Sequence, residues 1–234
     1  MECGQALLAK TELKIMSTIG YHHLEQVAKV CLVGPDASAV AKKLCQTIYT
    51  AIVDHGESIN SCKALVKYLF KEQTVIALDE FVGEHKGDNR KIDFYLLNDR
   101  FPINEAPVDS VISWAQLNPD QRYLRLASII SPVVVQNEQE MNRWSDIALK
   151  IIDKAPDKAA VIDALSSHLC PNSWSGSRAT IIEGRRSLAK ALFQHSDPIV
   201  VEQARVLDAR LHEWAEGEAE RERSRSRNLD ERFE

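Results

Sequence analysis

Apolar residues recur every three or four positions along most of this chain, which is the spacing of one face of an α-helix. Residues 36–53 show it most clearly, with a common face formed by Val40, Leu44, Ile48, Ala51 and Ile52. The same spacing predicts helices over residues 5–19, 22–33, 58–70 and 74–82. Further along it predicts three helix pairs, 108–117 with 119–130, 141–154 with 156–169, and 177–194 with 198–214 and beyond.

A proline–aspartate signal precedes or opens several helices, at Pro35-Asp36, Pro119-Asp120, Pro156-Asp157 and Asp197-Pro198. The intervals are 84, 37 and 41 to 42 residues. Because 84 is about twice 42, a further copy of the signal, without proline, is expected near residues 72–77. Proline suits the first helical turn because its missing N–H would have no partner there. Asn118 and Asp197 are predicted N-caps, and Asn118 with Gln121 has the spacing of a capping box.

A period near 40 with two helices per unit is typical of HEAT and armadillo repeats. The chain is therefore predicted to be all-α, an α-solenoid of about five antiparallel helix pairs with essentially no sheet. Residues 1–215 are expected to form one helical-repeat domain with an irregular connector at 84–107, in which 92–97 is expected to be helical. Residues 216–234 form a charged tail, predicted to be a helix that frays near Ser224.

The amino-acid composition is that of an ordinary globular protein, and it does not indicate an activity. The 234 residues carry a formal net charge of −5, with 44% hydrophobic and 27% charged residues, which argues weakly against broad nucleic-acid binding. Five cysteines lie at positions 3, 31, 45, 62 and 170 without a CxxC pair, so reduced thiols in a cytoplasmic protein are expected. The sequence predicts neither a secretory signal nor a membrane span.

No catalytic motif is evident in the sequence. It has no glycine-rich phosphate loop, no GxSxG and no pair of histidines at metal-binding spacing. Asp79, Glu80, Glu84 and His85 could together bind a metal, but a solvated helix end explains them more simply. The sequence therefore predicts no enzyme, no cofactor and no metal site.

Two basic groups are candidate interaction surfaces. Lys63, Lys67 and Lys71 share one helix face, which the following Lys86, Arg90 and Lys91 could extend toward a phosphate or an acidic protein. Arg178, Arg185 and Arg186, with Lys190, cluster on a later helix. For both groups a solvated helix face is the favoured alternative.

The four tryptophans, at 114, 144, 174 and 214, are predicted to pack between helices. Trp174 is unusual because it stands among small polar residues, in Asn172-Ser173-Trp174-Ser175-Gly176-Ser177-Arg178. We expect it to anchor this loop in a groove between repeats. The alternative is that it contacts a partner, because loops of repeat proteins carry binding surfaces.

Five short segments stand out from about Leu65 onward: 77–81 (ALDEF), 118–123 (NPDQRY), 173–178 (SWSGSR), 195–198 (HSDP) and 230–234 (DERFE). Through them, roughly 70% of the chain resembles the C-terminal HEAT-like helical-repeat region of large bacterial multidomain proteins. In such proteins this region is attached to NTPase or nuclease modules, some of them linked to antiviral defence. The resemblance implies a sensor or scaffold acting apart from such modules, and it assigns no catalytic residue.

The sequence thus favours a non-enzymatic helical-repeat scaffold or sensor that binds another protein through its concave face or its loops. The alternative is a helical repeat that binds nucleic acid through the two basic groups. Steep weakening with salt would distinguish the second from the first.

Overall fold

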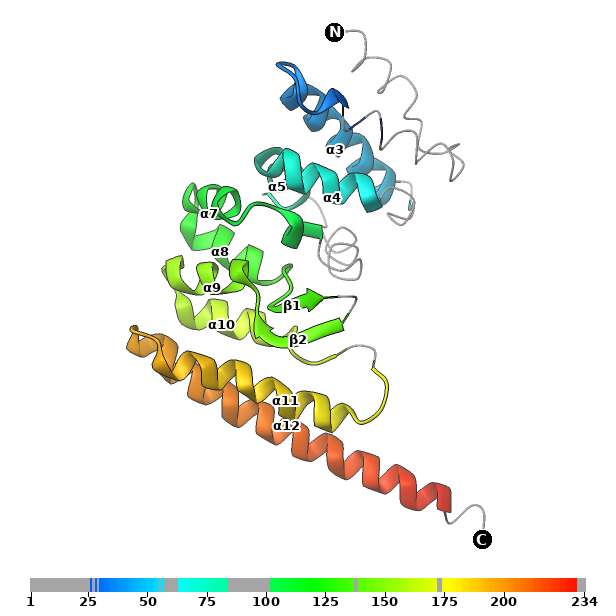
Figure 1. The fold of residues 1–234 in the computed structure, drawn as a ribbon, viewed down its shortest axis with the longest axis vertical. Coiled ribbons are helices and arrows are strands. Elements are labelled where there is room, and N and C mark those ends of the chain that lie inside the picture. The colour runs from blue at the N-terminus through cyan, green and yellow to red at the C-terminus, as the bar shows by residue number, and fades with distance from the viewer. Residues whose placement is uncertain are drawn as a thin grey trace. The chain divides into compact units, whose positions relative to one another are not determined.

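The computed structural model describes residues 26, 28, 30–54, 56, 63–83, 102–136, 139–171 and 174–230. These residues are mostly helical, and their one sheet has two antiparallel strands (Figure 1). The chain divides into two compact units, Met1–Ile130 and Ser131–Glu234. The mainly helical class predicted from the sequence is confirmed.

The first unit consists of short helices that contact their neighbours in the chain. They are α3 (Ala37–Val53), α4 (Lys63–Glu72), α5 (Thr74–Phe81), the 3-10 turn η3 (Pro102–Glu105), α7 (Val108–Gln116) and α8 (Pro119–Ala127). The apolar face predicted for α3 is buried in full, at Val40, Leu44, Ile48, Ala51 and Ile52. Packing of α5 against α3, α4 and α7 makes α5 the centre of this unit.

Polar contacts fix α7 and α8 against α5. Trp114 is buried, and its indole Nε1 donates to Asp79 Oδ1 at 2.6 Å. The Arg122 guanidinium lies 4.2 Å from the centre of the Trp114 ring and 3.6 Å from the same carboxylate. Pro119 occupies the first turn of α8 as predicted, but Asn118 forms no side-chain cap and donates to Gln121 instead.

The second unit begins with a hairpin that the sequence analysis missed. Its elements are β1 (Val133–Gln136), β2 (Gln139–Trp144), α9 (Asp146–Lys154), α10 (Lys158–Ser166), α11 (Arg178–Ala191), the turn η4 (Leu192–Gln194) and α12 (Pro198–Asp230). The prediction of a helix over 141–154 is therefore wrong for residues 141–144, which belong to β2, and right for the residues of α9. The prediction of essentially no sheet missed this one small hairpin. Three consecutive valines from Val133 favour a strand, and Ser145 starts α9 by accepting a hydrogen bond from the Ala148 N–H.

The hairpin packs its last residue against α11. Trp144 pairs with Val133 across the sheet, is buried, and donates from its indole to the Leu188 carbonyl at 2.9 Å. Gly184 of α11 lies so close to Asn142 that an added Cβ would approach the amide nitrogen to 2.8 Å. Trp144 is thus a packing residue as expected, but on a strand.

The later helices begin close to where the sequence places them. Asp157 caps α10 through the Ala160 N–H, and Asp197 accepts from the Ile199 N–H at the start of α12. Contrary to the predicted fraying near Ser224, α12 continues to Asp230. The helix expected over 5–19, the first part of the helix expected over 22–33, the segment 84–101 and the last four residues lie outside the described residues.

Candidate interaction site

The longest helix of the second unit, α12, buries one continuous stripe of side chains. The stripe repeats every three or four residues and comprises Val200, Ala204, Leu207, Leu211, Ala215 and Glu218. Glu222 continues the same spacing and is partly buried. The stripe packs against α11, so its two carboxylates meet the first turn of that helix. Figure 1 shows α12 running on beyond this turn.

Glu218 is a nearly buried carboxylate, with 8% of the residue exposed. Its Oε1 accepts from Arg178 Nη1 at 3.1 Å and from Arg221 Nη1 at 2.6 Å. Two guanidinium groups therefore share one carboxylate oxygen. Arg178 is largely covered, whereas the Arg221 side chain is 69% exposed and presents its remaining donors to solvent.

Glu222 closes the first turn of α11. Its carboxylate accepts from Ser177 Oγ at 2.8 Å, from the Arg178 N–H at 2.8 Å and from the Ala179 N–H at 3.2 Å. These hydrogen bonds lower the pKa of Glu222 below its usual value because they favour the charged form. The free N–H groups at the start of α11 are thus satisfied from α12.

A groove of about 380 Å³ opens beside this junction. It is lined by Cys170, Arg178, Ile182, Glu213, Trp214, Gly217, Glu218 and Arg221. Trp214 is 36% exposed and Trp174, in the loop before α11, is 43% exposed. The Arg178 guanidinium stacks over the Trp174 ring, with its central carbon 4.7 Å from the ring centre.

The predicted anchoring of Trp174 in a groove between repeats is therefore wrong. The ring is held from one side by Arg178, and much of it faces solvent. The alternative, in which Trp174 contacts a partner, stays a prediction. Its stacking on a cation keeps the ring in place without burying it.

A second, more open hollow of about 620 Å³ lies at the same end of the hairpin. It is lined by Ser177, Ala179, Thr180, Ala219, Glu222, Arg223, Ser226 and Arg227. Arg223 and Arg227 are exposed, whereas the Glu222 carboxylate is already hydrogen-bonded. The accessible charge on this side is therefore positive.

The three arginines predicted to share a basic face of α11 point to different partners. Arg185 is 3% exposed, pairs with Glu140 of β2 and donates to the Met141 carbonyl, and its burial lowers its pKa. Arg186 binds Asp208 through two hydrogen bonds of 2.8 and 3.0 Å, and these bonds raise its pKa. Because Arg178 pairs with Glu218, the cluster joins elements rather than forming a solvated cationic surface.

The lysine face of α4 is also partly neutralised. Lys67 lies 3.3 Å from Glu105 of η3, and Lys71 lies 3.9 Å from Glu72. Lys63 shares the helix, whereas Lys86, Arg90 and Lys91 lie outside the described residues.

Asp79 and Glu80, the two described members of the group considered as a metal site, have different partners. Asp79 accepts from Trp114, and Glu80 lies 3.8 Å from Lys42. Within the described part of the chain, no cluster of three His, Cys, Asp or Glu residues could hold a metal ion. Glu84 and His85 fall outside that part.

Sequence reasoning missed Glu218 and Glu222 as members of the site because they stand in an almost unbroken run of charge. One signal was present. Both continue the three-to-four-residue spacing that begins at Val200, and this spacing predicts burial whatever the side chain.

No helix among the described residues is long and apolar enough to cross a membrane. Comparison with protein-family models, with curated proteins and with solved structures found no match to this chain.

Proposed function

We propose that this protein is a non-enzymatic helical-repeat scaffold or sensor whose groove at the free end of the α11/α12 hairpin binds another protein. The observation that carries the proposal is the pair of partly exposed tryptophans, Trp174 and Trp214, beside a groove that contains Arg178 and Arg221. Tryptophan and arginine are the residue types most enriched where binding energy concentrates in protein interfaces.

The groove suits a peptide segment with an acidic residue next to an apolar one. Ile182 and Trp214 supply apolar surface for the second side chain. Arg178 and Arg221 share a single acceptor within the protein, so donors remain for a partner carboxylate. The positions of both guanidinium groups are already set by Glu218, which reduces the entropy lost on binding.

The solenoid arrangement belongs to the same proposal. In the second unit α9 packs on α10, α10 on α12 and α12 on α11, which is the succession expected of stacked helix pairs. In the first unit α5, α7 and α8 follow one another in the same way. We propose HEAT-like stacking within each unit, in which each pair covers the apolar face of the next.

The resemblance to helical-repeat tails of bacterial NTPase and nuclease proteins supports a role as a separate scaffold, with antiviral defence as the proposed setting. Nucleic-acid binding has less support from the geometry. Arg178, Arg185 and Arg186 are committed to carboxylates, and Lys67 lies beside Glu105.

The test is affinity capture from the native host with and without nuclease, comparing the natural protein with Trp174→Ala/Trp214→Ala. A specific protein that survives nuclease and is lost with the double variant is the expected result. Ile199→Ala is the matched control, because Ile199 is 55% exposed on α12 and does not line the groove.

Two results would contradict the proposal. Equal capture of the same protein by the natural chain and the double variant would place binding elsewhere. Loss of every bound protein after nuclease treatment would move the function to nucleic acid.

A further inference from the structure

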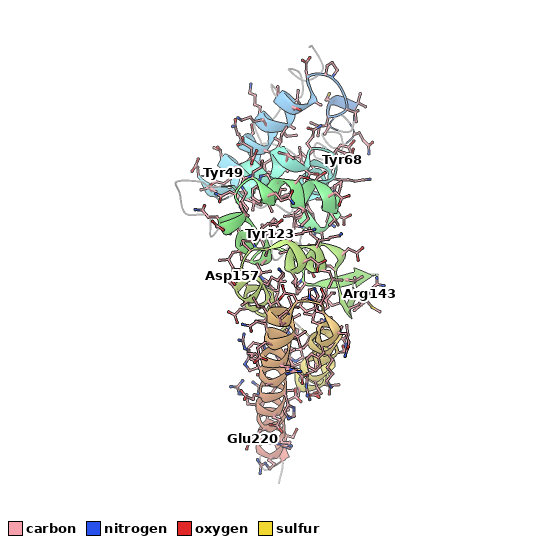
Figure 2. All side chains as sticks on the ribbon, turned by 90° about the vertical axis from the view of Figure 1, so that its left-hand side faces the viewer. Tyr49, Tyr68, Tyr123, Arg143, Asp157 and Glu220 are labelled. Carbon is pink, nitrogen blue, oxygen red and sulfur yellow. The ribbon has the colours of Figure 1, made fainter. Side chains whose placement is uncertain are left out.

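The outer face of α12, outside its buried stripe and with its basic end bordering the hollow beside the start of α11, carries a second charge pattern. Glu216, Glu220, Arg223 and Arg227 follow one another at intervals of 4, 3 and 4 residues, so they lie on one face of the helix. All four are exposed, and the Glu216 side chain is 71% exposed. Figure 2 shows Glu220 on the distal part of α12.

This face is acidic in its first half and basic in its second half. Within one helix the pattern is unfavourable, because Glu216 with Glu220 and Arg223 with Arg227 are like charges at four-residue spacing. Only Glu220 with Arg223 attracts at three-residue spacing. Within α12 the His212 imidazole lies 3.7 Å from Glu216, and opposite charges from outside the helix would relieve the like-charge contacts that remain.

We propose that this outer face of α12 pairs with the same face of a second copy of the chain, in antiparallel orientation about a two-fold axis. With the axis between Arg221 and Glu222, Glu220 faces Arg223 of the second copy. In the same alignment Glu216 faces Arg227 of the second copy. Because the two ends of the pattern are complementary, each ion pair occurs twice. One copy supplies the glutamate in the first occurrence and the arginine in the second.

The second copy fits better than a uniformly charged partner. A purely acidic segment would meet Glu216 and Glu220, and a purely basic one would meet Arg223 and Arg227. Like charges placed opposite one another oppose binding, so only a partner with the reversed order satisfies the whole face. The same helix running the other way has that order.

The contact would be small and ionic. The four positions span about 17 Å of helix, and exposed ion pairs are individually weak. We therefore expect association with a dissociation constant of about 1 mM at low ionic strength. This self-association is independent of the groove proposed above, because the groove lies on another side of α12.

Charge reversal tests the pairing. Glu216→Arg/Glu220→Arg makes the face wholly basic, and Arg223→Glu/Arg227→Glu makes it wholly acidic. Each variant alone should be monomeric by sedimentation equilibrium. An equimolar mixture of the two should associate, and the variant with all four reversals should self-associate like the natural chain.

Two further measurements, the salt dependence of association and the helix content of each variant, serve as controls. Raising NaCl from about 50 to 500 mM should weaken association by roughly tenfold or more, because exposed charges are screened. Circular dichroism should show unchanged helix in every variant, and Trp174→Ala/Trp214→Ala should still self-associate.

A natural chain that stays monomeric at millimolar concentration and low salt would overturn the pairing. So would self-association of both half-reversed variants at the natural strength, since that would place the contact elsewhere. A chain that remains monomeric but binds polyglutamate would assign the face to an acidic partner and would also overturn the inference.

Discussion

The buried stripe of α12 changes from apolar to charged along the α11/α12 hairpin while it keeps one helical register, and in the apolar half the Arg186–Asp208 ion pair lies outside the stripe. In the half near the connecting turn, α12 buries Val200, Ala204, Leu207, Leu211 and Ala215 against α11. In the free half, the same stripe presents the carboxylates of Glu218 and Glu222 to the start of α11. A single spacing therefore yields an apolar core at one end and a charged junction at the other.

The difference has a consequence for how each half responds to change. Burial of apolar surface involves no titrating group and no charge that salt could screen, and it stabilises in proportion to area. A carboxylate junction depends on the charge state of its members and on screening. The free end, where the proposed groove lies, is thus the adjustable half of the hairpin.

The largest effect is expected from the apolar half. Leu211→Ala removes a fully buried side chain, so the free energy of unfolding should fall by about 2–5 kcal/mol. Chemical denaturation followed by circular dichroism measures it, with the exposed Ile199→Ala as the matched control. Equal midpoints for the two variants would contradict the picture of an apolar core in this half.

A smaller effect is expected at the charged junction. Glu218→Ala leaves the largely covered Arg178 guanidinium without its carboxylate, so the free energy of unfolding should fall by about 1–3 kcal/mol. Glu220→Ala, two residues away and exposed, should change it by less than about 0.5 kcal/mol. Equal losses in the two variants would mean that Glu218 acts as an ordinary surface residue.

Apolar spacing in the sequence predicted the helices better than it predicted the strands. Apolar periodicity located α3, α5, α7, α8 and α10 to α12 close to their observed bounds, and it placed the inward residues of α3 correctly. It failed at residues 141–144, which belong to strand β2. Because Met141 and Trp144 are three residues apart and directly precede α9, their spacing predicts that they are part of that helix. Local propensity cannot settle such a case, because pairing with β1 and contact with α11 decide it.

The candidate site was harder to predict than the fold. Arg178, Arg185 and Arg186 stand close together in sequence, but the partners that tie them to other elements come from α12 for Arg178 and Arg186 and from β2 for Arg185. Each of these partners lies 22 or more residues away along the chain. Charge in the sequence therefore indicated where ionic groups gather, but not which of them remain accessible.

A local effect should follow from Glu222→Gln. Glutamine keeps an oxygen that can accept hydrogen bonds but loses the charge that favours the start of α11. Amide hydrogen exchange at Arg178 and Ala179 should become several-fold faster, while residues of the apolar half keep their rates. Glu220→Gln is the control, and faster exchange throughout α11 would show that the two halves are not separable.

The smallest effect is the pH dependence of this junction. Because the pKa of Glu222 is lowered in the folded protein, the charged form stabilises the junction at pH values above the ordinary glutamate value of 4.5. That contribution should be lost as the pH falls through the lowered pKa. Asp197 and Asp208 also have lowered pKa values, so acid will weaken other contacts as well.

The difference between the natural chain and Glu222→Gln isolates Glu222 from those other carboxylates. Amide exchange at Ala179 should differ between the two proteins near neutral pH, and the difference should disappear below the lowered pKa of Glu222. A difference that persists unchanged into strong acid would show that the glutamine disturbs packing rather than charge. In that case the free half of the hairpin would be held like the apolar half, and the contrast between them would fail.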